Sequence, residues 1–113
     1  MGNAVLNEAV VLQGPALPGD LSIPPRAVGL VLFAHGSGSS RLSTRNRWVA
    51  QQLQQHGLAT LLFDLLTEKE AEDRRLVFDI PLLAQRVVHA MRWVEQREEL
   101  AGLRLGLFGA STG

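Results

Sequence analysis

Apolar residues recur in two distinct patterns along the chain. Continuous apolar runs at residues 28–34, 58–63 and 103–108 are typical of strands that a parallel sheet buries on both faces. Between these runs, residues 44–56 and the stretch that follows Asp79 carry apolar side chains at helical spacing. This alternation predicts an α/β fold with a mostly parallel sheet, right-handed crossovers and helices on both faces.

The N-terminal region predicts two further strands. Residues 4–13 alternate loosely between apolar and polar and are bounded by the turn signals at 14–15 and 18–20. Residues 21–23 are expected to form a short strand that the prolines at 24–25 end.

Capping residues set the expected limits of the two main helices. Ser43 or Thr44 can cap the first helix, and Gly57 suits its end because glycine adopts a positive φ without steric cost. Asp79 is the expected cap of the second helix, with Pro81 in its permissive first turn.

The second helix is expected to bury one apolar stripe and to be closed by Gly102. The stripe consists of Ile80, Leu83, Ala84, Val87, Val88, Met91 and Val94. The strongly charged segment 67–75 is expected to form an exposed loop or a short helix.

The candidate chemistry lies at the carboxyl ends of the predicted strands, where open parallel sheets bind ligands. Residues 109–113, Gly-Ala-Ser-Thr-Gly, fit G-x-S-x-G, the elbow that holds a nucleophilic serine on a strained turn between strand and helix. Ser111 is therefore the candidate nucleophile. A plain turn of small residues is the alternative interpretation, but the buried strand before it and a matching loop upstream favour the elbow.

That upstream loop, His-Gly-Ser-Gly-Ser-Ser at residues 35–40, follows the first central strand. Acyl transfer builds negative charge on a carbonyl oxygen, which two preorganised backbone N–H groups can stabilise. The expected donors are Thr112, the residue after the nucleophile, and either Ser37 or Gly36. His35 is expected to brace this loop by hydrogen bonding rather than to act as the base.

Other polar residues favour structural roles. Asp64 ends a strand on the same rim, and it either ties down the following loop or serves as a displaced catalytic acid; the first interpretation is favoured. His56 and His89 have no neighbouring ligand at metal-binding spacing. No metal or cofactor is expected.

Composition restricts the classes of protein to which the chain can belong. The 113 residues fit a single domain spanning 1–113, with 46% apolar residues, 11 basic and 11 acidic side chains and no cysteine. A net charge of zero gives no attraction for nucleic acid or an anionic membrane. The N-terminus lacks the pattern of a signal peptide, and no apolar run approaches the roughly 20 residues of a membrane span. A cytoplasmic protein is expected.

At these residues the chain resembles the α/β-hydrolase superfamily and, within it, the dienelactone-hydrolase-like branch. The similar stretches are residues 30–41, 45–47, 57–64 and 108–113. Some bacterial members of this branch look similar across nearly the whole chain, including versions fused to a phosphoribosyltransferase domain. The resemblance implies a serine nucleophile at Ser111, oxyanion donors at Thr112 and in the loop at residues 35–37, and hydrolysis of a small ester, lactone or related acyl substrate without metal or cofactor.

The chain departs from the branch in two ways. Dienelactone hydrolases proper use a cysteine nucleophile, which this chain lacks, so dienelactone itself is a doubtful substrate. The catalytic acid and histidine of the family follow the elbow in chain order, and no residue here can be assigned to them. The chain is therefore interpreted as the truncated N-terminal half of such an enzyme, with little turnover of its own.

Two alternatives compete with this interpretation. The chain can be a non-catalytic fragment or half of a pseudo-enzyme that needs a partner chain, because an open sheet edge favours pairing and self-association. It can also be a nucleotide-binding oxidoreductase of the short-chain dehydrogenase type, since residues 106–113 resemble a glycine-rich dinucleotide turn. The absent G-x-G-x-x-G order and the hundred or so residues before the turn disfavour the oxidoreductase.

Overall fold

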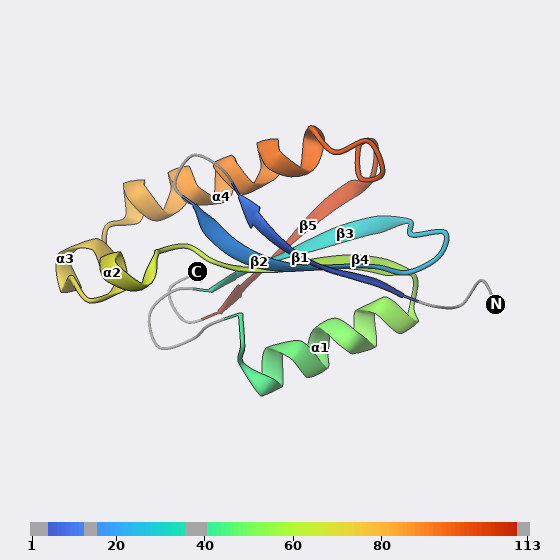
Figure 1. Ribbon diagram of the computed structural model, residues 1–113, viewed down its shortest axis with the longest axis horizontal. Coiled ribbons are helices and arrows are strands. Elements are labelled where there is room, and N and C mark those ends of the chain that lie inside the picture. Colours follow the sequence, from blue (N-terminus) through green and yellow to red (C-terminus); the bar gives the residue numbers. More distant parts are fainter. Residues whose placement is uncertain (1–4, 13–15, 36–40, 111–113) are drawn as a thin grey trace.

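A five-stranded sheet in the order β1-β2-β4-β3-β5 forms the centre of the computed structural model, which describes residues 5–12, 16–35 and 41–110. The strands are β1 (Leu6–Leu12), β2 (Leu17–Ile23), β3 (Gly29–His35), β4 (Leu58–Asp64) and β5 (Arg104–Ala110). The helices are α1 (Thr44–Gln55), α2 (Glu68–Ala71), α3 (Arg74–Val77) and α4 (Ile80–Glu95). α1 covers one face of the sheet and α4 the other (Figure 1).

The three predicted central strands are neighbours and run parallel. β3 pairs with β4 on one side and with β5 on the other. Their apolar runs are continuous because both faces of the sheet are covered: Leu32, Leu61 and Phe63 are fully buried. On the α1 side, Phe33 packs against Ala50 and stacks on Phe108 with ring centroids 4.8 Å apart.

The sheet is mixed rather than mostly parallel, which corrects the sequence-based expectation. β2 pairs antiparallel with both β1 and β4. The turn expected at 18–20 is also wrong, because these residues lie within β2. Pro18 lies one residue outside the part of β2 that pairs with β4, where a missing N–H removes no bond to that strand. A Cβ on Gly19 would lie 3.2 Å from the Leu62 carbonyl oxygen, so glycine permits the close approach of the strands.

Local capping signals predicted the helix starts correctly. The Ser43 side chain accepts a hydrogen bond from the Asn46 N–H at the start of α1, and Asp79 accepts one from Leu82 at the start of α4. Gly57, just after α1, has a φ of 85°, as its C-terminal position requires.

The end of α4 was predicted too late. The helix ends at Glu95 and is followed by turns up to Gly102, whose φ is 90°. Leu100 is buried, yet a continued helix would place it about 120° around the axis from the buried Val94. Leaving the helix therefore allows Leu100 to enter the core.

The predicted apolar stripe of α4 is only partly buried. Leu83 and Val94 are buried, as expected, whereas Ile80 and Val88 are exposed. None of the helices in the described ranges is long and apolar enough to cross a membrane.

Candidate active site

The carboxyl ends of the parallel strands meet at one edge of the sheet. His35 at the end of β3 is the register partner of both Asp64 in β4 and Ala110 in β5. The sequence-predicted site residues Gly36, Ser37, Ser111 and Thr112 lie outside the described residues. The described strands thus bring together the starting points of both candidate segments.

His35 joins β3 to the end of β4. Its side chain is 2% exposed, and its Nδ1 lies 2.9 Å from the Phe63 carbonyl oxygen. Because a carbonyl oxygen only accepts, Nδ1 donates this hydrogen bond. Nε2 is buried without a partner among the described residues. The His35 backbone oxygen also accepts a bond from the Leu65 N–H at 3.1 Å, so this residue braces the strand end.

Asp64 contacts the chain just beyond the upstream loop. Its Oδ1 accepts a hydrogen bond from the backbone N–H of Arg41 at 2.8 Å. The Arg41 guanidinium lies 3.2 Å from Asp20 through Nη1 and 3.9 Å from Asp64 through Nε. Arg47 of α1 donates to the same Asp20 carboxylate at 2.9 Å. The sequence predicted that Asp64 ties down the loop that follows it, whereas these contacts join it to Arg41, which lies upstream between β3 and α1.

Sequence analysis also missed the ion pair between Arg86 and Glu70. Arg86 of α4, with a side chain 11% exposed, donates to both carboxylate oxygens of Glu70 at 2.8 and 2.7 Å and to the Leu65 carbonyl oxygen at 3.0 Å. Hydrogen bonding from Arg86 lowers the pKa of Glu70 to about 2 and raises the pKa of Arg86. Thr67 and Glu70 form a capping box, and the T-x-x-E pattern was the available sequence signal.

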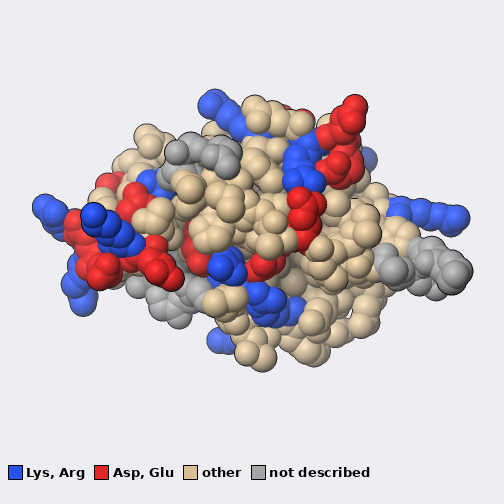
Figure 2. Space-filling model, viewed as in Figure 1, with Lys and Arg blue, Asp and Glu red and all other residues tan. Residues whose placement is uncertain are grey.

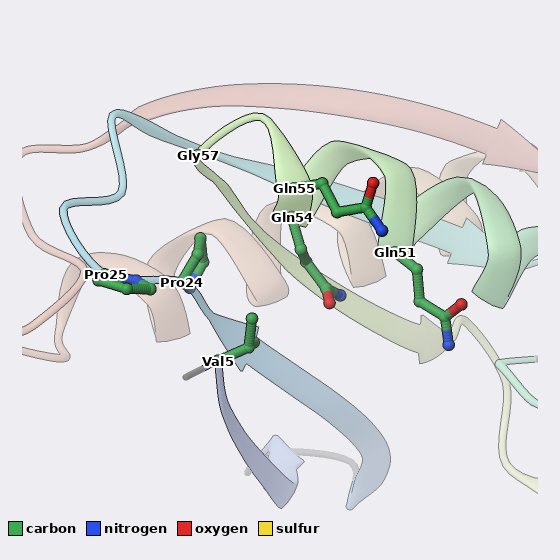
Figure 3. Close-up of a pocket in the computed structure, with 7 residues that line it drawn as sticks. All are labelled: Val5, Pro24, Pro25, Gln51, Gln54, Gln55 and Gly57. Atoms are coloured by element: carbon green, nitrogen blue, oxygen red, sulfur yellow. The ribbon is translucent and has the colours of Figure 1, made fainter. Parts of the chain in front are cut away.

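Charged side chains and one sizeable pocket mark the described surface. Basic and acidic side chains are interspersed on the face shown in Figure 2 and gather most densely over α2 and α3. A pocket of about 460 Å³ lies at the opposite end of the sheet, where β2 ends and β4 begins. Gln51, Gln54 and Gln55 of α1 line it together with Pro24 and Pro25 (Figure 3). The described ranges contain no group of three or more potential metal ligands.

Comparison with solved structures identifies the fold family of the chain. The crystal structure of dienelactone hydrolase from Anabaena variabilis is 51% identical, with a TM-score of 0.86 over 100% of this chain and 54% of its own. The fold is that of the α/β-hydrolases, and the chain resembles their dienelactone-hydrolase-like branch. Est1E from Butyrivibrio proteoclasticus, 16% identical, has a TM-score of 0.72 over 95% of this chain and 41% of its own; that likeness shows the fold alone.

Among curated proteins, the chain is similar to one from Mycobacterium tuberculosis named "Putative phosphoribosyl transferase". The two are 51% identical over 107 residues, which cover 94% of this chain and 24% of that protein. The chain therefore spans about half of the Anabaena hydrolase and a quarter of the mycobacterial protein. No protein-family model matches it.

Proposed function

We propose that this chain supplies the nucleophile, Ser111, and the oxyanion donors of a serine hydrolase. The enzyme acts on small esters, lactones or related acyl bonds. The observation that carries the proposal is the register pairing of His35 with Ala110. Adjacent strands lie about 4.8 Å apart, so His35 and Ala110, the residues that precede Gly36 and Ser111, lie side by side. A nucleophile and an oxyanion donor that act on one acyl group must lie close together, and this placement of the two strand ends allows it.

In this reaction the Ser111 hydroxyl attacks the acyl carbon, and a base takes its proton. The carbonyl oxygen becomes an oxyanion, which accepts hydrogen bonds from the backbone N–H groups of Thr112 and of Ser37 or Gly36. The intermediate collapses to an acyl-serine, the leaving group takes a proton from the conjugate acid, and water then releases the product acid. We assign base and orienting acid to residues beyond Gly113 in a longer protein, and the reaction needs no metal or cofactor.

The similarity to hydrolases supports this function over that of a phosphoribosyltransferase or of a nucleotide-binding oxidoreductase. The mycobacterial name describes a protein about four times as long as the matched region, and the matched region itself has the fold of hydrolases. In the present fold residues 106–110 of the glycine-rich segment lie within β5, at the edge of the sheet, whereas a dinucleotide turn follows the first strand of its unit.

A non-catalytic role that depends on a partner chain is the second candidate, and one feature favours it. Among the described strands β5 pairs with β3 alone, and Leu107 on this edge strand is 61% exposed. Open strand edges with apolar side chains pair readily with other chains. We propose that the 113-residue chain associates with itself through this edge.

Covalent labelling tests the hydrolase proposal. A longer protein that contains this chain is treated with a fluorophosphonate probe, and the adduct is mapped by peptide mass spectrometry beside a Ser111→Ala variant. We expect one adduct, on Ser111, and none in the variant. An adduct on another residue, or none, would reject the assignment.

A further inference from the structure

The two ends of the segment 36–40 are fastened to the same short stretch of chain. On the upstream side, His35 bonds through Nδ1 to the Phe63 carbonyl oxygen at 2.9 Å and through its own carbonyl oxygen to the Leu65 N–H at 3.1 Å. On the downstream side, the Arg41 N–H donates to Asp64 Oδ1 at 2.8 Å. Three consecutive residues at the end of β4 therefore hold both ends.

Side-chain charges strengthen the downstream attachment. Arg41 lies between the carboxylates of Asp20, on β2, and Asp64, on β4, and Asp20 also binds Arg47 of α1. The side chains of the two aspartates and Arg41 are all about one-quarter to one-third exposed. Two positive and two negative charges offset one another, so the cluster restrains position without creating a net charge. Partial burial makes these pairs stronger than fully exposed ones.

We propose that Asp64 is a positioning residue for the oxyanion loop and acts through the backbone of Arg41. This inference rests on the proposed function. Oxyanion donors must lie within a few tenths of an ångström of their productive positions, and misplacement by about 1 Å can cost about 100-fold in rate. The bond to Asp64 fixes the backbone at Arg41, three residues before α1 begins at Thr44. A shorter span between two fixed points has less conformational freedom.

Kinetics of substituted proteins test the positioning role in a longer protein that contains this chain. Asp64→Ala removes the acceptor of the Arg41 N–H, and Asp64→Asn keeps an acceptor but removes the charge. We expect kcat for p-nitrophenyl acetate to fall about 10- to 100-fold in Asp64→Ala, with KM changed less than about twofold, and to recover partly in Asp64→Asn. Asp73→Asn is the matched control, because Asp73 pairs with the exposed Arg75 of α3; its kcat should not change.

Trypsin provides a readout that does not depend on activity. It cleaves after Arg41, whose side chain and backbone the cluster holds, and release of one charge-assisted bond should raise cleavage there about tenfold. The rate is measured in Asp64→Ala relative to cleavage after the exposed Arg75 in the same protein. Faster cleavage with unchanged kcat, or a lower kcat with unchanged cleavage, would overturn the positioning role. Absence of a Ser111 adduct would instead reject the proposed function, and the cleavage ratio would still decide whether Asp64 holds Arg41.

Discussion

Replacing Glu70 with glutamine removes the anion that faces a nearly buried arginine. The carboxylate accepts two hydrogen bonds from Arg86 and one from the backbone N–H of Thr67. Glutamine keeps one acceptor oxygen but presents an NH₂ group to the second guanidinium nitrogen, so two donors face each other. The Leu65 carbonyl oxygen remains as the only other acceptor for Arg86 in the described part of the chain.

The magnitude follows from the pKa of Glu70, which hydrogen bonding from Arg86 lowers from 4.5 to about 2. This difference corresponds to at most about 3.4 kcal/mol of folding free energy. Because the Glu70 side chain remains 26% exposed, solvent screening reduces the expected loss to about 2 kcal/mol at pH 7. A loss of that size lowers the Tm of a domain this small by about 8 °C.

The lowered pKa of Glu70 also determines how its contribution to stability changes with pH. The folded-state pKa of Glu70 lies below its unfolded value of 4.5, so the ionised group stabilises the fold fully above about pH 5. Most of this contribution disappears as the pH falls from about 5 to 2, and the carboxyl is protonated in both states only below its folded-state pKa of about 2. The difference in unfolding free energy between wild type and Glu70→Gln should therefore shrink over the same range.

Urea denaturation followed by circular dichroism at pH 7, 5, 4 and 3 measures this difference. Glu68→Gln, an exposed site on the same helix, is the matched control and should change the unfolding free energy by less than about 0.5 kcal/mol. A Glu70→Gln loss below about 0.5 kcal/mol at pH 7 would refute the reasoning. A loss that stays constant from pH 7 to 3 would show that packing, rather than charge, causes it.

Three further outcomes are expected. Leu107→Lys should abolish the concentration-dependent self-association of the chain in sedimentation velocity, whereas Leu6→Lys on the opposite edge strand should not; a monomeric wild type would contradict this. The 113-residue chain should hydrolyse p-nitrophenyl acetate no faster than its Ser111→Ala variant, because we assign the base to residues of a longer protein; turnover lost in the variant would reveal a base within these residues. Phe33→Ala should lower the unfolding free energy by about 3–5 kcal/mol, because Phe33 is fully buried, and the exposed Phe78→Ala by less than about 0.5 kcal/mol; similar losses in both variants would contradict the assigned packing.

The parts of the fold that depend on neighbours in the chain were predictable from sequence. Apolar runs indicated the three central strands and their parallel pairing. Ser43, Asp79 and Gly57 indicated where helices begin and end, because capping involves residues only a few positions apart. The G-x-S-x-G pattern likewise proposed Ser111 as a nucleophile from five adjacent residues, and that assignment remains a prediction because Ser111 lies outside the described residues.

The features that depend on the order of strands in the sheet emerged only from the tertiary structure. Pro18 and Gly19 suggest a turn, yet they lie in a strand because both pair with β1, and Gly19 also pairs with β4. Arg86 pairs with Glu70, which is 16 residues away in the sequence, and Arg41 pairs with Asp20, which is 21 residues away. Patterns among neighbouring residues in the sequence do not predict these pairs. A charged residue in the sequence has many possible partners, and packing the helices against the sheet selects one of them by bringing it within hydrogen-bonding distance.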